Sequence, residues 1–261
     1  MMRSLWTSAT GMVAMQMQID TISNNLANVN TTGFKKSRIE FEDLIYQTIK
    51  MAGSPVQGDV RVPVGIQVGM GVRPTTVHKF FSQGDYQNTG NPLDFAIEGD
   101  GFFQVMVNDE LMYTRAGAFK LDQDGRVVTA NGYILQPEFV APPETKTIAM
   151  SENGHLSAMD ANGQELAGVD VNLYTFINPP GLQAKGKNLY TPTEASGEAV
   201  EGEPGTDNVG TIAQGFLEMS NVEVVEEMVA MIVGQRAYEM NSKAIQTSDS
   251  MLQTAVQLKR A

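Results

Sequence analysis

The chain has 261 residues, of which 42% are hydrophobic, so it is long enough to bury a sizeable core in one or two domains. It contains no cysteine, which excludes disulfides, thiolate metal sites and cysteine nucleophiles. The net charge of −12 disfavours nucleic acid as a partner, because phosphate binding needs lysine and arginine gathered on one face. The basic cluster Lys35, Lys36 and Arg38 is too small to change this.

Two observations concern export and membranes. Thr7, Ser8 and Thr10 interrupt the apolar core that a cleaved secretory signal would need near the N-terminus. The longest strongly apolar run, MVAMIV at 228–233, is far shorter than the roughly 20 residues that cross a bilayer. The sequence therefore predicts neither a cleaved signal peptide nor direct insertion into a membrane.

A helix is predicted over residues 5–29, because its apolar residues repeat in sevens. The two core positions of this heptad are held by Leu5, Met12, Ile19 and Leu26 and by Ser8, Met15, Ile22 and Val29. A stripe this narrow is typical of a coiled-coil seam rather than of a helix lying on a globular core. The helix is expected to pair with another helix.

Four asparagines, Asn24, Asn25, Asn28 and Asn30, lie at the end of this helix, although asparagine is a poor helix former. A capped C-terminus around Gly33 explains Asn30 but not Asn24 and Asn25. Amides beside a coiled-coil seam fix register and partner number, because an amide buried without its partner is costly. We therefore predict that Asn24, Asn25 and Asn28 take part in pairing between subunits.

Residues 51–75 are rich in glycine and proline and are predicted to be extended. The glycines of GIQVGMGVRP would suit a phosphate-binding loop, but such a loop must open a helix, and here Pro74 and β-branched residues follow. No cofactor is predicted.

The middle of the chain is predicted to be antiparallel β. The short β-type runs are DFAI, FFQVMV, RVVT, YILQ and VDVNLYTFI. Turn signals at 123–126, 130–133, 152–155 and 161–164 each place glycine after Asn or Asp, as tight hairpins require. Residues 191–211 are rich in Gly, Pro, Thr and Glu and are predicted to be an exposed loop leading to a final helix.

No set of residues predicts a catalytic or metal centre. DQDG at 122–125 has the paired acids of a calcium-binding loop, but Lys120 and Asn131 stand where ligands are needed, so a hairpin turn is preferred. His78 and His155 lack an obvious third ligand. Paired acids such as Asp122 with Asp124 could do acid/base work only in a cleft, and nothing in the sequence indicates one.

A second helix is predicted from about Asn221 to Lys259, with Ser220 or Asn221 as N-cap and acids in its first turns. At 1.5 Å per residue it would extend roughly 57 Å. Its first half, from Val224 to Val233, is apolar on most sides. One partner helix cannot cover such a surface.

The stretch SNNLANVNTTGFKKSR at 23–38 resembles the N-terminal signature of the axial proteins of the bacterial flagellum, which comprise rod, hook and related subunits. The resemblance continues in GDGFFQV at 99–105, in YTRAGAFKLDQDGRVVTANGY at 113–133 and in the stretch 220–253. Within this family, the first 12 residues, FEDLIYQTI at 41–49 and the segment to about residue 74 are most similar to distal rod subunits. Residues 134–200 match the family least.

The residue patterns and the resemblance together predict an α+β fold, in which long N- and C-terminal helices form a coiled-coil pair and an antiparallel β-rich domain intervenes. The expected division is an N-terminal coiled-coil helix at 1–34, an extended linker and rod-type insertion at 35–75, a β-rich outer domain at 76–212 and a C-terminal coiled-coil helix at 213–261.

The resemblance implies a structural protein rather than an enzyme: a distal rod subunit that forms an open helical homo-oligomer, a rigid tubular shaft that transmits torque to the hook. It implies as partners proximal rod subunits, hook or hook-adjacent subunits, the surrounding P and L ring proteins and the flagellar export apparatus. The expected location is the basal body, where the distal rod crosses the periplasm towards the outer membrane, after export without a cleaved signal. The low-charge segment 51–75 is expected to wedge between subunits and hold the shaft straight.

The residues predicted to form subunit interfaces are Leu5, Met12, Met15, Ile19, Ile22, Asn24, Asn25, Leu26, Asn28, Val29, Val225, Met228, Val229, Ile232, Tyr238, Ile245 and Leu252. Three alternatives stay open. The chain could be another axial subunit of the hook or proximal rod, a secreted enzyme acting on glycans, or a soluble coiled-coil adaptor that forms a small closed oligomer.

Overall fold

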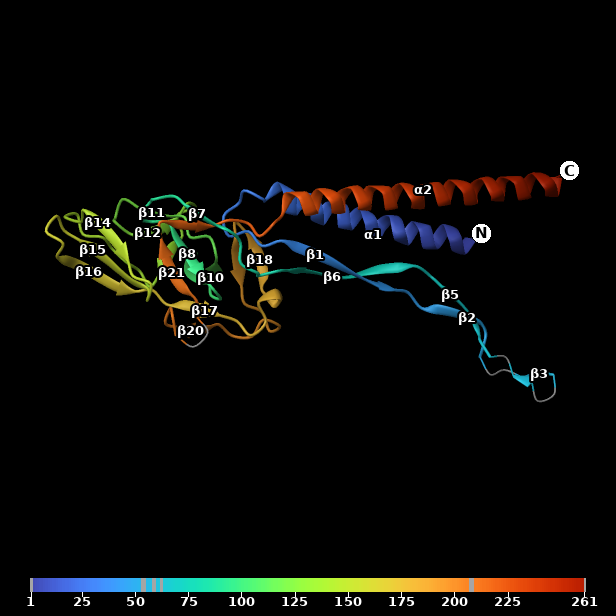
Figure 1. Ribbon diagram of the computed structural model, residues 1–261, viewed down its shortest axis with the longest axis horizontal. Coiled ribbons are helices and arrows are strands. Elements are labelled where there is room, and N and C mark those ends of the chain that lie inside the picture. Colours follow the sequence, from blue (N-terminus) through green and yellow to red (C-terminus); the bar gives the residue numbers. More distant parts are fainter. Residues whose placement is uncertain (1, 53–54, 58–59, 62, 207–208, 261) are drawn as a thin grey trace. The chain divides into compact units, whose positions relative to one another are not determined.

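The computed structural model describes residues 2–52, 55–57, 60–61, 63–206 and 209–260 (Figure 1). It contains two long helices, α1 (Met2–Ala27) and α2 (Val224–Arg260), with β-strands between them. The chain forms two compact units: unit 1 comprises residues 1–26, 37–78 and 224–261, and unit 2 comprises residues 27–36 and 79–223. The predicted α+β fold, with terminal helices around an antiparallel β region, is confirmed.

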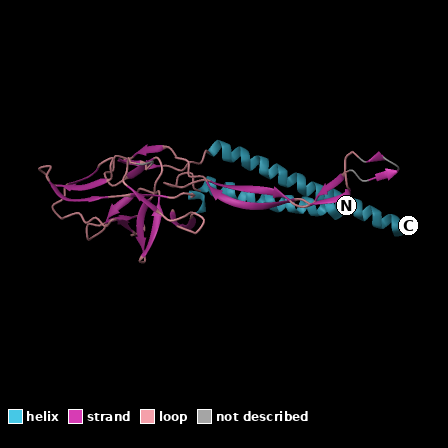
Figure 2. Ribbon diagram, turned by 90° about the horizontal axis from the view of Figure 1, so that it is seen from below, coloured by secondary structure: helices cyan, strands magenta, loops and turns pink. Residues whose placement is uncertain are grey.

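In unit 1 the two helices pack against each other in antiparallel directions, side by side in Figures 1 and 2. The hydroxyl oxygens of Ser4 and Ser248 lie 3.1 Å apart. One heptad further along α1, a methyl group added at Gly11 would lie 3.0 Å from the amide nitrogen of Asn241. Further still, a methyl group added at Gly234 would lie 3.3 Å from a side-chain carbon of Ile19.

Each step of about seven residues along α1 is thus matched by a step of seven back along α2, which is the coiled-coil spacing expected for α1. The ends of both helices differ slightly from the prediction. Helix α1 ends at Ala27, so Asn28 and Val29 lie in the following turn rather than on the helical stripe.

Helix α2 begins at Val224, so the prediction that Ser220 or Asn221 caps it is wrong. The amide of Asn221 is engaged elsewhere, because its Oδ1 accepts a hydrogen bond from the backbone N–H of Lys36 (2.8 Å) and its Nδ2 donates to the carbonyl of Phe80 (3.0 Å). The acidic first turn is as expected, with Glu226 and Glu227 near the positive end of the helix dipole.

The rest of unit 1 is a long nested hairpin, which we call the arm (residues 37–78). Its strands are β1 (Ser37–Asp43), β2 (Tyr46–Lys50), β3 (Pro55–Gln57), β4 (Val60–Arg61), β5 (Ile66–Gly69) and β6 (Val72–Lys79). Strand β1 pairs with β6, β2 with β5 and β3 with β4. The predicted extended character of residues 51–75 is therefore confirmed where the chain is described, and residues 53–54, 58–59 and 62 lie outside the described residues.

Unit 2 holds the hydrophobic core between several small antiparallel sheets. Its strands are β7 (Tyr86–Asn88), β8 (Phe95–Glu98), β9 (Phe103–Val107), β10 (Glu110–Thr114), β11 (Phe119–Leu121), β12 (Val127–Thr129), β13 (Ile134–Gln136), β14 (Thr147–Met150), β15 (His155–Met159), β16 (Glu165–Asp170), β17 (Leu173–Thr175), β18 (Gln183–Gly186), β19 (Leu189–Thr191), β20 (Val200–Gly202), β21 (Thr211–Gln214) and β22 (Phe216–Glu218), with a short 3-10 helix η1 (Pro179–Gly181). The largest sheet has the order β11-β12-β13-β9-β10-β19-β18. Phe103 of β9 and Leu135 of β13 are fully buried on this sheet, and they share one core cluster with the fully buried Phe95 of β8.

All four predicted hairpin turns are confirmed. They join β11 to β12, β12 to β13, β14 to β15 and β15 to β16, and their glycines, Gly125, Gly132, Gly154 and Gly163, have φ between +77° and +86°. Only glycine adopts this conformation without strain, which is why the Asn-Gly and Asp-Gly signals located the turns.

The prediction for residues 191–211 is wrong in two respects. The segment contains strand β20, which pairs with β17, and it leads to strands β21 and β22 rather than directly to the final helix. These strands have three or four residues each, too few for a periodic hydrophobic pattern to reveal them.

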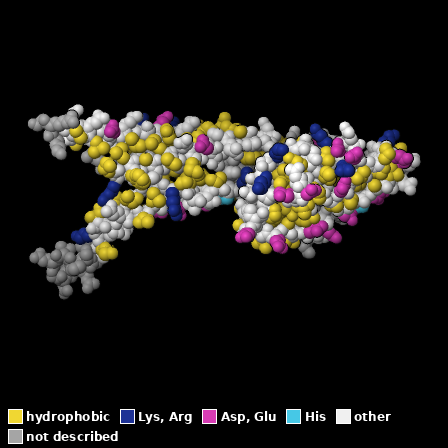
Figure 3. Space-filling model, turned by 180° about the vertical axis from the view of Figure 1, so that it is seen from behind, with side chains coloured by type: hydrophobic (Ala, Val, Ile, Leu, Met, Phe, Trp, Pro, Cys, Tyr) yellow, Lys and Arg dark blue, Asp and Glu magenta, His cyan; other side chains and the backbone are white. Residues whose placement is uncertain are grey.

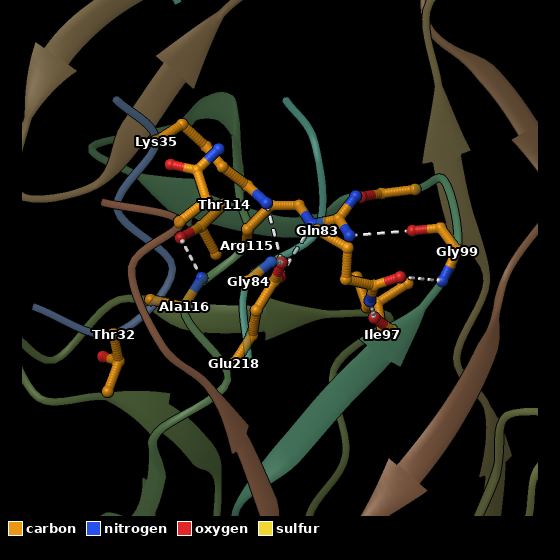
Figure 4. Close-up of polar contacts among 12 residues, drawn as sticks. Thr32, Lys35, Gln83, Gly84, Ile97, Gly99, Thr114, Arg115, Ala116 and Glu218 are labelled. Carbon is orange, nitrogen blue, oxygen red and sulfur yellow. Dashed lines mark hydrogen bonds and ion pairs between the residues drawn. The ribbon is translucent and has the colours of Figure 1, made fainter. Parts of the chain in front are cut away.

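A buried cluster of charges joins distant segments of unit 2 (Figure 4). The Lys35 Nζ lies 2.7 Å from Glu218 Oε1, and the Arg115 Nε donates to Glu218 Oε2 at 3.0 Å. Lys35 also donates to the Ser82 carbonyl (2.8 Å), and the Arg115 guanidinium donates to the carbonyls of Gly99 (2.7 Å) and Gly101 (3.1 Å). In the sequence, Lys35 was noted only as a member of a small basic cluster, whereas in the structure its side chain is 0% exposed.

The cluster shifts the acidity of its members. Burial alone would raise the pKa of Glu218, but Arg115 and Lys35, with hydrogen bonds from Lys35 and from the Gly84 N–H, together hold that pKa below its ordinary value. Burial lowers the pKa of the Lys35 ammonium, and Arg115 lowers it further, although Glu218 opposes both effects. Glu218 therefore carries the negative charge that makes two buried cations tolerable.

No helix among the described residues is long and apolar enough to cross a membrane.

The first prediction concerns this cluster. Replacing Glu218→Gln leaves two buried cations without a counter-charge and is expected to lower the free energy of unfolding by about 3–5 kcal/mol. Because the folded-state pKa of Glu218 lies below its unfolded value, its contribution to stability is complete above the unfolded pKa and is lost as the pH falls through the folded pKa. Urea titrations between pH 3 and 7 should thus show a weaker acid destabilisation in E218Q. The control is the exposed Glu203→Gln, and equal losses in both variants would contradict the assignment.

The second prediction concerns the helix pair. Replacing Gly234→Leu places a side chain where even a methyl group would lie 3.3 Å from Ile19. Such overpacking costs about 1–3 kcal/mol, from which the better helix propensity of leucine recovers up to about 1 kcal/mol. We expect a lower urea midpoint of the helical circular-dichroism signal, whereas Gln235→Leu, at an exposed neighbour, should leave the midpoint nearly unchanged. A stabilised G234L would show that the helices do not approach closely there.

Candidate assembly surface

The helix pair of unit 1 has two chemically different sides. The seam, where α1 meets α2, is built from Ser4, Gly11, Ile19 and Asn25 on α1 and from Ser248, Asn241, Gly234 and Glu227 on α2. Most of these side chains are small or polar. Large apolar side chains lie instead on the outer surface, and Figure 3 shows hydrophobic side chains gathered over the helical part of the molecule.

The outer surface of α2 is apolar at its N-terminal end. We define the ridge as Val225, Met228, Val229, Ile232 and Val233, whose side chains are between 51% and 74% exposed. Val225 and Gly234 are nine residues apart, or about two and a half turns at ~3.6 residues per turn, so the ridge points away from the seam. The expectation that one partner helix cannot cover this stretch is confirmed.

The predicted interface residues fall into three groups by exposure. Asn24, Val225, Met228, Val229, Ile232 and Tyr238 are exposed. Leu5, Met12, Met15, Ile19, Leu26, Asn28, Val29, Ile245 and Leu252 are partly buried. Ile22 and Asn25 are buried. In a single chain, the exposed residues of the first group, most of them on α2, are therefore accessible to other molecules. That all 17 residues lie between subunits stays a prediction.

Asn25 is used inside the chain. Its side chain is 1% exposed; its Nδ2 donates to the Ser37 carbonyl (2.8 Å) and to Glu227 Oε2 (3.2 Å), and its Oδ1 accepts from the Ser37 N–H (2.9 Å). The amide therefore joins α1 to the start of β1 and to the first turn of α2. Within unit 1 it fixes the register of three segments, which explains an asparagine inside a helix.

Of the residues considered for chemistry, His78 lies on strand β6 of unit 1, and the others lie on the surface of unit 2. Asp122 and Asp124 sit in the β11–β12 turn, where they line an open cleft of about 540 Å³ that the sequence did not indicate. Asp124 is 68% exposed and lies 3.7 Å from Arg126. Asp122 and Asp124 therefore lie on an exposed turn. A catalytic acid and base need different surroundings, such as partial burial of one carboxyl group, and this turn does not provide them.

His155 has two acidic neighbours that sequence reasoning missed, because they lie on the adjacent strand β16. Its Nδ1 is 2.5 Å from Asp170 Oδ1 and its Nε2 is 3.0 Å from Glu165 Oε1. Hydrogen bonds to Asp170 and Glu165 raise the pKa of the imidazole. Among the described residues, no three His, Asp or Glu side chains are arranged to hold a metal ion.

Comparison with known families gives three matches spread along the chain. The model described as "Flagella basal body rod protein" matches residues 5–35, "Flagellar hook protein FlgE/F/G D1 domain" matches residues 96–158, and "Flagellar basal body rod FlgEFG protein C-terminal" matches residues 213–258. The first and last of these contain most of α1 and most of α2, including the ridge and every seam residue except Ser4.

Full-length relatives carry the same description. The flagellar basal-body rod protein FlgG of Borreliella burgdorferi is 50% identical over 264 residues, which cover 100% of both chains. The protein of this name from Buchnera aphidicola subsp. Schizaphis graminum is 47% identical over 260 residues, 99% of this chain and 100% of its own. That of Caulobacter vibrioides is 44% identical over 261 residues, again 99% and 100%. The chain therefore belongs to the flagellar basal-body rod protein family, and its predicted role as a structural subunit of the rod is confirmed.

Proposed function

We propose that this chain forms the distal part of the rod by polymerising through the outer surface of its helix pair into a rigid, tubular drive shaft that carries torque to the hook. The observation that supports this most directly is the ridge on α2. Its five large apolar side chains are more than half exposed in the single chain. Soluble monomers rarely leave such a contiguous patch uncovered, and a patch of this kind marks an interaction surface.

The free energy gained by burying the ridge is sufficient to drive assembly. Burying one Val, Ile or Met side chain contributes about 1.5–3 kcal/mol, so covering several members of the ridge can offset the entropy that association costs. A contact between two different surfaces of identical subunits produces an open helix unless its rotation closes a ring. Repetition of one such contact yields a shaft.

The partners that we propose follow from the position of such a shaft in the basal body. We propose that the chain contacts further copies of itself, proximal rod subunits at one end and hook or hook-adjacent subunits at the other, with P and L ring proteins around it. It reaches the basal body through the flagellar export apparatus, without a cleaved signal, and crosses the periplasm towards the outer membrane. Its acidic charge disfavours nucleic acid, and insertion into a membrane is not part of this role.

The alternatives have less support. The nearest alternative is another axial subunit of the hook or proximal rod, since one matched model is described as a flagellar hook protein domain. A glycan-acting enzyme would rely on Asp122 and Asp124, which lie on an open, exposed turn. An adaptor would form a small closed oligomer, which electron microscopy of the purified protein distinguishes from filaments.

The third prediction tests the ridge. Replacing Ile232→Glu puts a charge into the apolar contact and is expected to raise the critical concentration for polymerisation by more than tenfold. The monomer should keep its melting temperature, because Ile232 is 51% exposed in the single chain. Sedimentation and negative-stain electron microscopy measure the first quantity and circular dichroism the second. Ala161→Glu, in the β15–β16 turn, adds the same charge away from the helices and should polymerise normally; unimpaired filaments of I232E would refute the proposed surface.

The fourth prediction tests the arm. We propose that residues 51–75 of the arm wedge between neighbouring subunits and keep the shaft straight, as the low charge of this segment and the exposure of the preceding strand β2 suggest. Deleting residues 52–66, part of which lies outside the described residues, should give filaments that still form but bend. Their persistence length, measured in electron micrographs against the full-length chain, should fall. Filaments as straight as before would exclude this role.

A further inference from the structure

Unit 1 carries an apolar groove between α1 and the arm. It has a volume of about 280 Å³, and its walls include Trp6, Ala9 and Val13 of α1 and Leu44, Val72 and Pro74 of the arm. Trp6 is 61% exposed and Val13 is 56% exposed, although both face this groove. A large aromatic side chain left more than half exposed in a groove is a feature that an apolar partner would cover.

The chemistry of the groove suits a protein side chain better than a small molecule. Ligand sites combine apolar walls with a few polar groups that fix orientation. Here the Thr10 hydroxyl already donates to the Thr7 carbonyl, and the Arg73 guanidinium at the rim is paired with Glu42. The groove therefore offers area but no converging polar groups.

The ridge has the spacing that such a groove accepts. Val225, Met228, Val229 and Ile232 occupy positions i, i+3, i+4 and i+7 of α2, the pattern by which an amphipathic helix enters an apolar groove. The acid Glu223 precedes this ridge and Glu226 lies within it, whereas the groove has the base Arg73 at its rim. Because Glu42 already balances the charge of Arg73, the two surfaces match chiefly in their apolar character.

The ridge of a chain cannot fill the groove of the same chain. Gly11, in the middle of the groove-bearing part of α1, lies opposite Asn241, and Val229 is about 12 residues from Asn241, or roughly 18 Å along α2. The ridge also points away from α1. We propose that the groove of one subunit binds the ridge of a second copy of this chain. This inference rests on the proposed function and specifies its contact.

Formation of one such contact leaves each of the two subunits with a further free binding surface. A subunit whose groove is filled still presents its own ridge, and one whose ridge is buried still presents its own groove. The pairing is heterologous, so it adds subunits in one direction rather than closing a dimer.

The chain offers two clean probes for a test. Trp6 is its single tryptophan, and it has no cysteine, so introduced thiols have no natural competitor. On polymerisation of the otherwise natural chain, the emission of Trp6 should shift to shorter wavelength, and quenching by acrylamide should fall at least threefold. Mixed filaments of Val13→Cys and Val229→Cys chains should give disulfide-linked dimers on mild oxidation. Lys243→Cys, further along α2, should give few when mixed with V13C.

The outcomes separate this contact from the proposed function. Filaments in which Trp6 stays as quenchable as in the monomer would overturn the groove contact while leaving polymerisation intact. A protected Trp6 without V13C–V229C dimers would also overturn it, because another surface would then fill the groove. A chain that forms no filaments under any assembly condition would instead refute the proposed function. Trp6→Ala should raise the critical concentration at least fivefold without changing monomer melting.

Discussion

The close approach of the two helices in unit 1 is the constraint on which the rest of the assembly surface depends. A methyl group added at Gly11 or Gly234 would lie only 3.0 Å from Asn241 or 3.3 Å from Ile19, so the helices approach closely along mainly small and polar side chains. The apolar half of α2 has more large side chains than this seam can hold, and Val225, Met228 and Ile232 face outwards instead. Tight packing inside the subunit thus leaves exposed the apolar surface for which we propose a neighbouring subunit.

Buried polar groups perform a different task from the apolar packing. Asn25 in unit 1 and Glu218 in unit 2 are almost fully buried, and each bonds segments far apart in the chain. Such groups add little net stability over apolar residues of the same volume, but a wrong arrangement leaves them unpaired at high cost. We infer that they select one arrangement of segments, and that the core around Phe95 and Phe103 supplies most of the stability of unit 2.

The features that local sequence determines were predictable. The heptads of α1 predicted the helical part of the fold class, and the glycines predicted the four hairpin turns. Both signals depend only on residues within one element. The Lys35–Glu218 pair spans 183 residues and the Arg115–Glu218 pair spans 103, so no local pattern marks them. Asn25 was recognisable as an amide at a seam, yet its partner Glu227 is 202 residues away in the same chain. The groove was missed for a similar reason, since one wall is helical and the other combines strand β6 with Leu44, which follows β1.

The apolar ridge is short, and this limits the axial register in which two subunits can pair. Beyond Val233 the same outward face of α2 carries Arg236, Glu239 and Lys243. A uniform apolar stripe would let one subunit slide by a turn of about 5.4 Å against its neighbour at little cost. Here a slip of one turn would bring Arg236 to the place of Ile232 in an apolar groove, where an unpaired charge is expensive to bury. The change from apolar to charged residues along α2 therefore favours a single axial register between two subunits. A shaft under torque needs such contacts, because subunits with a second register of similar energy could slip past one another.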